Sequence, residues 1–138
     1  VFVIMPFSET WSHNVYAQLI EPAVRGAGLE CSRGDIPVRV GDLSTNIWNE
    51  ILKAGIIIAD VSSANVNVFY ELGLVHAVGK DALLLKRKDA ALPADFGGAH
   101  YYEYSVDKLS EGRAQLQEAL LQWSAEYRTF SVKALYGK

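Results

Sequence analysis

The chain has 138 residues, enough for one domain with a single core, and a formal net charge of −3 at pH 7. Half of the residues are hydrophobic and 21% are charged, which is ordinary for a soluble globular protein. The acidic balance argues against a general nucleic-acid binder, and no apolar run approaches the ~20 residues that span a bilayer. The single cysteine, Cys31, excludes an intrachain disulfide and fits a reducing, cytoplasmic compartment.

The first part of the chain predicts a strand, a helix and a second strand. The apolar run Val1–Met5 is typical of a buried strand, and Pro6 stops it. From Trp11 to Ala27 apolar residues recur at helical spacing, and Pro22 inside this pattern predicts a kink or a break. A short strand is predicted at Leu29–Ser32.

Residues 36–46 show no clean period and predict a long loop that moves or mediates contacts. A second helix is expected to begin at Thr45 and to end at Gly55. Four residues are expected to face inward from this helix: Ile47, Trp48, Ile51 and Leu52.

The central stretch, residues 56–80, predicts a strand, a tight polar loop and a helix. The β-branched run at its start ends at Asp60, and apolar residues at helical spacing follow from Asn67 to Gly79. This is the βα unit of a parallel sheet, in which ligands bind at the carboxyl ends of the strands. We therefore expect Asp60 and Glu71 to meet at the rim of one crevice.

The remainder predicts a strand at 82–85 closed by a solvated basic run at 86–88, a loop at 92–98, a strand at 100–104 and a last helix from Leu109 to Tyr127. Strands and helices alternate five times, which predicts a doubly wound α/β sandwich with right-handed crossovers.

We expect residues 1–128 to form a single domain and residues 129–138 to form a tail that leads out of it or into another domain. The chain begins at Val1 without an initiator methionine, so we interpret it as a domain cut from a longer protein or as a trimmed numbering.

Glu71 has two interpretations. Acidic residues near helix N-termini are commonly there because the helix dipole favours them, by about 0.3–1 kcal/mol. Here apolar residues flank the acid on both sides, so it interrupts an apolar segment beside a strand-end crevice. The second interpretation is a catalytic carboxylate, which the helix terminus would keep ionised, as a nucleophile requires.

Other polar residues also have two interpretations. Asp60 either caps the turn that follows it or acts in catalysis. Ser62 and Asn67 are loop formers that stand where a helix N-terminus binds phosphate or ribose hydroxyls. Arg33 either pairs with Asp35 on the surface or meets a substrate phosphate.

Several familiar sites are excluded. Neither the GxGxxG dinucleotide fingerprint nor the GxxxxGK[ST] phosphate loop occurs. His13, His76 and His100 show no metal-ligand spacing with one another or with Cys31, so we expect no metal site and no catalytic histidine. Three residues are expected in the core: Cys31, Trp48 and Trp123.

Four segments carry a family resemblance: VFVIMPFSETW, RGD, IIIADVSSANVNVFYELGLVHAVGK and LPADF. Over about residues 1–104 they resemble the nucleoside 2-deoxyribosyltransferase-like proteins and the related bacterial TIR-like domains. The resemblance implies a flavodoxin-like (Rossmannoid) three-layer α/β sandwich with a mostly parallel five-stranded sheet. It also implies cleavage of N-glycosidic bonds, with the reaction carried by the glutamate at the position of Glu71.

The same resemblance implies that Asp60, Asn67 and Tyr70 shape the pocket beside that glutamate. It places four residues on the opposite wall: Met5, Pro6, Phe7 and Ser8. The chain departs from both families. Deoxyribosyltransferase pockets hold a further acid where Asn65 and Asn67 stand here, and TIR domains carry a Trp-Cys pair where this chain has Phe69 and Tyr70.

The chemistry suits one carboxylate. Breaking a C1′–N bond passes through an oxocarbenium-like state, which an anion stabilises or captures covalently. Nicotinamide leaves NAD+ as a neutral molecule, whereas a purine or pyrimidine needs protonation by a second acid. Asp60 is the nearby candidate and Asp35 the next, and the missing further acid favours NAD+.

We therefore predict an N-glycosidase that acts on NAD+ or on a deoxynucleoside or deoxynucleotide. No cofactor is expected, and NAD+ enters only as a candidate substrate. The alternative is a non-catalytic nucleotide-sensing or self-assembly module of the same fold. In either case the expected partners are a small-molecule nucleotide or nucleoside and further copies in a homo-oligomer, with no nucleic acid and no membrane.

Overall fold

Strands and helices alternate along the part of the chain that the structure describes. The structure is a computed structural model, and it describes residues 1–33, 43–91 and 101–136, without the side chains of 43–45 and 126–136. Several predicted features lie outside the described residues: Asp35, most of the loop at 36–46, the loop at 92–98, and His100.

Five strands form one sheet in the order β2-β1-β3-β4-β5, and each pairing between neighbours is parallel. The strands are β1 (Phe2–Ile4), β2 (Ser32–Arg33), β3 (Ile57–Asp60), β4 (Ala82–Arg87) and β5 (Tyr101–Tyr104). In the register, Val3 lies beside Ile58, and Ile58 lies beside Leu83. This strand order is that of flavodoxin-like sheets and confirms the predicted α/β fold.

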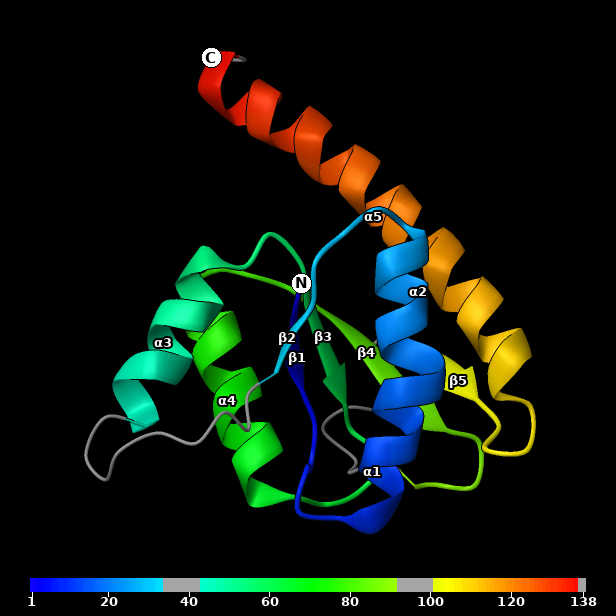
Figure 1. The fold of residues 1–138 in the computed structure, drawn as a ribbon. Helices are drawn as coiled ribbons and strands as arrows, with labels where there is room; N and C mark the ends of the chain where they lie inside the picture. The colour runs from blue at the N-terminus through cyan, green and yellow to red at the C-terminus, as the bar shows by residue number, and fades with distance from the viewer. Residues whose placement is uncertain (34–42, 92–100, 137–138) are drawn as a thin grey trace.

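Helices cover both faces of the sheet, which makes three layers (Figure 1). The helical segments are α1 (Thr10–Val15), the π-helical turn η1 (Tyr16–Ile20), α2 (Glu21–Gly26), α3 (Leu43–Lys53), α4 (Val66–Ala77) and α5 (Leu109–Tyr136). One face carries α3 and α4, which contact each other. The other face carries α1, η1 and α2, and α5 packs beside η1 and α2.

The core is divided between the two faces because successive strand residues point in opposite directions. In β1, Val3 belongs to the layer under α1, η1, α2 and α5, whereas Ile4 belongs to the layer under α3 and α4. In β3, Ile58 and Ile57 divide in the same way. Both faces of the strands are buried, which explains why these strands read as continuous apolar runs.

The helix predicted around Pro22 continues through a π-helical turn. Proline lacks an N–H group, and its ring crowds the carbonyl of the residue four positions earlier, here Gln18. The Gln18 carbonyl instead accepts a hydrogen bond from Arg113 Nε of α5, at 3.0 Å. The disturbance predicted at Pro22 is thus η1, which ends where α2 begins and keeps the helix running. Gly28, with φ of 76°, follows the end of α2.

Two predictions about α3 are wrong. The helix begins at Leu43 rather than at Thr45. Trp48 and Leu52 are 38% and 47% exposed rather than inward-facing. Ile51, by contrast, is fully buried. One position along a helix turns a side chain by about 100°, so Leu52 leaves the core stripe on which Ile51 lies.

The basic run at 86–88 is only in part the solvated end that was predicted, because Lys88 is exposed but Lys86 is not. β4 continues through Arg87, and Lys86 is only 6% exposed. Lys86 Nζ donates to the Arg87 carbonyl at 3.1 Å and lies 5.8 Å from the centre of the Tyr101 ring. The aliphatic part of the Lys86 side chain is therefore buried, and its ammonium group lies beside a backbone carbonyl.

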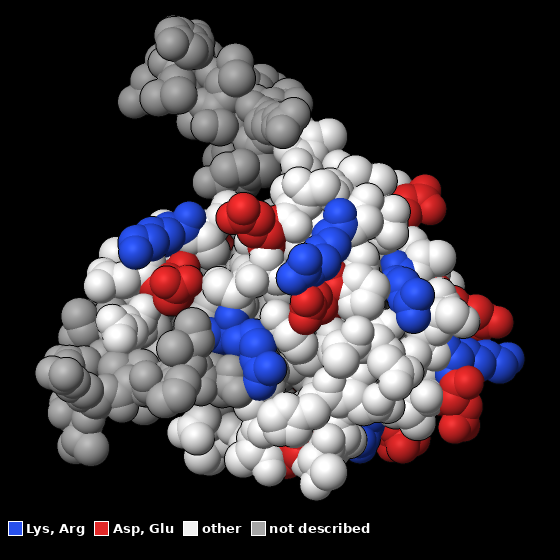
Figure 2. All heavy atoms as spheres, in the orientation of Figure 1, with Lys and Arg blue, Asp and Glu red and all other residues white. Residues whose placement is uncertain are grey.

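The last helix continues beyond its predicted end at Tyr127, because α5 runs to Tyr136. Figure 1 shows its C-terminal part extending beyond the three layers. Whether residues 129–138 lead to another domain stays a prediction. Within the described residues, no helix is both long and apolar enough to cross a membrane. On the face drawn in Figure 2, basic and acidic side chains are interspersed rather than gathered by sign.

Lys80 joins α3 to the turn after α4. Its Nζ donates to three backbone carbonyls at the end of α3, those of Ile51, Leu52 and Ala54, at 2.8, 2.8 and 2.9 Å. The last carbonyls of a helix have no partner within the helix, and a cation placed there also complements the helix dipole. Burial lowers the pKa of Lys80, but the three carbonyls hold its charged form in place.

We predict that Lys80→Met lowers the free energy of unfolding by about 1.5–3 kcal/mol, the range for hydrogen bonds to a charged group. Lys53→Met is the matched control, because Lys53 also lies in the last turn of α3 and is exposed. Urea unfolding of both variants measures the difference. Equal losses in the two variants would show that the three carbonyl contacts add nothing.

Candidate functional site

The carboxyl ends of β1 and β3 form the switch point of the sheet. The two strands are neighbours, yet the chain leaves β1 for α1 on one face and leaves β3 for α4 on the other. In doubly wound sheets this divergence opens the crevice in which ligands bind. The residues that follow the two strands, 5–9 and 61–65, therefore border the candidate site.

The loop from β3 to α4 is fixed by its own side chains. The Ser62 N–H donates to Asp60 Oδ1 at 2.8 Å. Asn65 caps α4, because its Oδ1 accepts from the N–H groups of Asn67 at 3.0 Å and Val68 at 3.2 Å. The helix therefore begins at Val66, just before the start expected at Asn67. These bonds set the direction in which α4 leaves the sheet.

Glu71 lies on the flank of α4 that borders the core. It follows Val68 by three positions and precedes Val75 by four, and both of these residues are buried against the sheet. Its side chain is partly buried, and burial raises the pKa of its carboxyl to about 7. Among the described residues, none forms a hydrogen bond or an ion pair with this carboxyl.

The expectation that the helix terminus keeps Glu71 ionised is wrong. The influence of the helix dipole fades within the first turn, and Glu71 lies in the second. Desolvation by the core therefore prevails, and near pH 7 the carboxyl is about half protonated. No partner within the described part of the chain fixes either protonation state of this acid.

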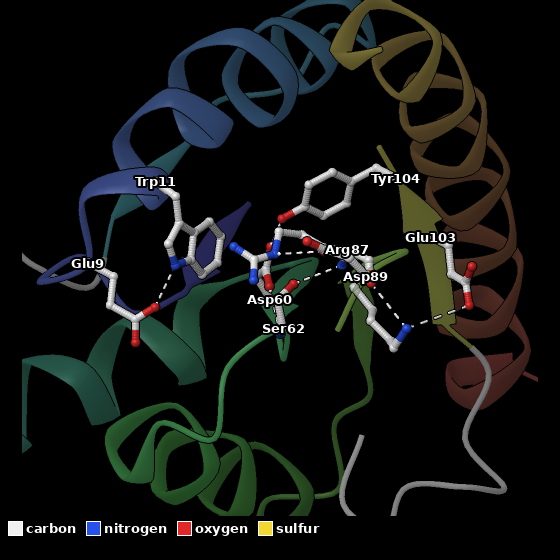
Figure 3. A network of polar contacts seen from close by, with 9 residues as sticks. Glu9, Trp11, Asp60, Ser62, Arg87, Asp89, Glu103 and Tyr104 are labelled. Carbon is white, nitrogen blue, oxygen red and sulfur yellow. Dashed lines mark hydrogen bonds and ion pairs between the residues drawn. The ribbon is translucent and has the colours of Figure 1, made fainter. Parts of the chain in front are cut away.

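Asp60 is enclosed in a hydrogen-bonded network at the ends of β3, β4 and β5 (Figure 3). It is 0% exposed. Its Oδ2 accepts from the Tyr104 hydroxyl at 2.6 Å. The Ser62 Oγ, next to it, accepts from the backbone N–H of Arg87 at 2.8 Å. Of the two interpretations of Asp60, this geometry is that of a turn cap which also ties strands together.

The pKa values of this network reflect its enclosure. Burial raises the pKa of Asp60, although the hydrogen bonds from Ser62 and Tyr104 oppose the rise. Burial and the neighbouring Asp60 raise the pKa of Tyr104 above its usual range, so this hydroxyl remains a donor. Sequence reasoning missed Tyr104. The signal that identifies it is its place as the last residue of a predicted strand.

The two acids do not share one rim as expected. Asp60 follows Ile58 by two positions in β3 and therefore points to the face of α1, η1, α2 and α5, where its partner Tyr104 is buried. Glu71 belongs to α4, which covers the opposite face. Asp60 therefore lies on one face of the sheet, and the helix of Glu71 covers the other.

A stacked pair of side chains lies beside the Asp60 network. The Arg87 guanidinium carbon lies 4.6 Å from the centre of the Trp11 ring. Trp11 Nε1 donates to Glu9, which fixes the indole, and Arg87 Nε lies 3.3 Å from Asp89 Oδ1 (Figure 3). Arg87 belongs to the run at 86–88 that was predicted to be solvated. Its place at the end of a strand is the signal that was not weighed.

The loop after β1 holds the four residues that the resemblance places opposite Glu71, and their role as a pocket wall stays a prediction. Of these four residues, Ser8 is exposed. The other three are buried: Met5, Pro6 and Phe7. The Arg33 guanidinium carbon lies 4.4 Å from the Phe7 ring centre and 4.8 Å from that of Tyr16. Arg33 of β2 thus packs beside the loop that follows β1. Its predicted pairing with Asp35 lies outside the described residues.

The other predicted site residues are spread out. Ser62 is buried and its oxygen serves the network of Asp60. The Asn67 side chain is exposed near the start of α4. Tyr70 is 63% exposed on the side of α4 away from the sheet, so the structure does not bring its ring to the core flank of Glu71. Their roles toward a substrate stay predictions.

In the described residues, no cluster of three or more His, Cys, Asp or Glu side chains suits a metal ion. His13 and His76 are exposed. Cys31 is a partly buried free cysteine that accepts from the Tyr16 hydroxyl at 3.4 Å. Trp123 packs against the core as predicted, whereas Trp48 does not.

Comparison with known proteins shows the fold. No protein-family model matches the chain, and no curated protein matches its sequence at a significant level. The solved structure of BcmB from Clostridium botulinum, described as a CMP N-glycosidase, is similar with a TM-score of 0.62 and 18% sequence identity. The match covers 88% of this chain and 99% of that chain. The chain therefore has the fold of a nucleotide N-glycosidase.

We predict that Tyr104→Phe lowers the free energy of unfolding by about 1–3 kcal/mol, because it leaves a buried oxygen of Asp60 without its donor. Tyr101→Phe, which removes a hydroxyl from the other end of the same strand, is the control. Chemical unfolding of both variants provides the measurement. A loss in Tyr104→Phe no greater than in the control would contradict the role of this bond.

We predict a pH dependence of stability that comes from Glu71. Its native pKa of about 7 lies above the ordinary 4.5, so the native state binds the proton more tightly and stability falls as pH rises between these values. Glu71→Gln removes this fall, and the variant gains stability relative to wild type on going from pH 5 to pH 8. Glu118→Gln, at an exposed position of α5, is the control. Parallel pH profiles for wild type and Glu71→Gln would overturn the prediction.

Proposed function

We propose that the chain is an N-glycosidase of nucleotides in which Glu71 is the catalytic carboxylate. The observation that carries the proposal is the partly buried carboxyl of Glu71, which has no partner among the described residues and lies on α4, the helix that follows the switch-point strand β3. Acids with strongly perturbed pKa values beside a crevice are candidates for catalysis. The fold shared with a structure described as a CMP N-glycosidase supports the same class of reaction. Membership of the deoxyribosyltransferase-like and TIR-like families remains a hypothesis.

The proposed reaction breaks the bond between the anomeric carbon and the base. The bonding electrons leave with the base, and the ionised Glu71 oxygen faces the positive charge that develops on the sugar, either stabilising it or bonding to C1′. Water or another acceptor then takes the sugar. The raised pKa of Glu71 suits this role, because a developing cation favours the ionised form most strongly where water is scarce.

The proposed role of Asp60 is to position rather than to donate a proton. Its two oxygens are used by Ser62 and Tyr104, and the side chain has no exposed surface. This favours a base that leaves without protonation, as nicotinamide leaves NAD+. A cytosine or purine nucleotide would need a proton from elsewhere, so both classes belong in the test.

We predict that wild type releases free base from at least one of NAD+, CMP and dCMP. Chromatography measures the base that is released. Glu71→Gln should lower the rate by about 10²–10³-fold or more, because the charge facing the transition state is lost. The wild-type kcat/KM should rise with pH through about 7 as Glu71 ionises. Equal rates in wild type and Glu71→Gln would refute the assignment. Glu118→Gln is the control, because it removes a negative charge at an exposed position of α5.

A non-catalytic sensing or self-assembly module is the second candidate function. It is favoured by large apolar side chains that are exposed on the outer helices: Trp48 and Leu52 on α3, and Val66 and Tyr70 on α4. Such groups often mark contact surfaces. Calorimetry that finds tight nucleotide binding, with no base release in the monomer or in any oligomer, would favour this function. A homo-oligomer remains a proposal.

A further inference from the structure

Arg87 lies at the carboxyl end of β4, and its neighbours do not use all of its hydrogen-bond donors. Its guanidinium lies over the Trp11 ring, with 4.6 Å from Cζ to the ring centre. Its backbone N–H donates to Ser62 Oγ, in the loop that leads to the helix of Glu71. Figure 3 shows the guanidinium between Trp11 and the Asp60 network. One face of this cation is thus fixed by stacking.

The donor groups of Arg87 are incompletely satisfied. Its Nε is buried and makes no hydrogen bond, although Asp89 Oδ1 lies 3.3 Å away. Within the described residues, its two terminal nitrogens have no acceptor either. The Asp89 side chain is 70% exposed, so this ion pair is weak and its carboxylate is free to move away. A planar cation with a fixed face and unused donors is suited to bidentate binding of a phosphate.

Among the described residues, Arg33 is another arginine at the carboxyl end of a strand, and its setting differs. It lies on β2, an outer strand of the described sheet, and two rings, those of Phe7 and Tyr16, flank its guanidinium. Arg87 lies on β4, next to β3, and only the indole stacks on it. Through Ser62, Arg87 is also tied to the loop that positions α4. Arg87 is therefore the better placed of the two to act together with Glu71.

We propose that Arg87 binds the phosphate of a nucleotide whose sugar faces Glu71, so that the site selects nucleoside 5′-monophosphates over nucleosides. This inference rests on the proposed function and names its substrate class. In the bound state the phosphate oxygens replace Asp89 as the partner of the guanidinium. Trp11, held by Glu9, keeps the guanidinium plane in place while the phosphate binds. Among the described residues, three acids belong to the surroundings of Arg87: Asp89 lies 3.3 Å from its Nε, Glu9 holds the stacked indole, and Asp60 is buried in the adjoining network.

The experiment measures binding without turnover. Calorimetry in the Glu71→Gln background compares each monophosphate with its own nucleoside: CMP with cytidine, AMP with adenosine, and nicotinamide mononucleotide with nicotinamide riboside. We expect at least one monophosphate to bind about 10–100-fold more tightly than its nucleoside, as charge-assisted hydrogen bonds would give. Arg87→Gln should abolish this ratio while the affinity for the nucleoside stays the same. Arg87→Lys should keep part of it, because the charge remains and the fork is lost.

Two further variants make the outcome specific. Lys88→Gln removes an adjacent, exposed positive charge and should leave the ratio unchanged. If Arg33→Gln abolishes the ratio and Arg87→Gln does not, the phosphate lies beside β2 and the inference is overturned. It is also overturned if no monophosphate binds better than its nucleoside, or if Arg87→Gln weakens both ligands equally.

Folding and catalysis are controlled separately. The melting temperature of wild type should rise more with the preferred monophosphate than with its nucleoside, and this measurement needs no variant. An equal rise would overturn the inference even if Arg87→Gln fails to fold. None of these measurements depends on turnover. Absence of base release by wild type would refute the proposed function, whereas the binding measurements alone decide whether Arg87 binds the phosphate.

Discussion

The hydrogen bonds that enclose Asp60 tie the ends of three strands together, and the positions of the candidate groups depend on them. Tyr104 joins β5 to β3, and the Arg87 backbone joins β4 to the loop after β3 through Ser62. A buried carboxyl is tolerated only when its oxygens are paired, so the partners cannot drift apart without a large cost. The carboxyl edge is consequently rigid where β3, β4 and β5 meet, and the loop that starts α4 begins from this fixed point.

Asp60 and Glu71 show two different outcomes of burial. Asp60 has partners for both oxygens, which makes it part of the framework. Glu71 has lost water without gaining a partner among the described residues, so its proton affinity has risen. The framework acid has little to offer a ligand, whereas the unpartnered acid gains from any positive charge that approaches it. Binding and ionisation at Glu71 are therefore linked, and a cationic ligand would lower its pKa.

The parts of the fold that follow from local periodicity were predictable, and the parts that depend on neighbouring elements were not. The strand at Ile57–Asp60 and the helix after it are strongly patterned and were placed to within two residues. The burial of Lys86 depends on β5 and on the ring of Tyr101, which no local pattern reveals. The exposure of Trp48 has a similar origin, because helical spacing predicts which face of the helix is apolar but not how much of that face is buried.

The positions of Asp60 and Glu71 at the end of a strand and in the next helix were predictable, but the faces of the sheet on which they lie were not. The rule that ligands bind at strand carboxyl ends identified Asp60 and the loop that follows it. It could not say that Asp60 points to one face of the sheet while α4 presents Glu71 from the other, since that depends on strand register and on the face that each crossover covers. Tyr104 and Arg87 were missed because their importance comes from partners that are distant in sequence.

The enclosure of Asp60 also limits the chemistry open to Glu71. A single carboxyl cannot serve in one step both as the anion that faces the sugar and as the acid that protonates the leaving base. In the proposed reaction an anionic Glu71 would work only in the ionised fraction, which grows as pH rises through its pKa of about 7. As an acid, it would work in the protonated fraction, which shrinks over the same range. The direction in which rate changes with pH therefore assigns the role of Glu71, and with it the kind of base that leaves.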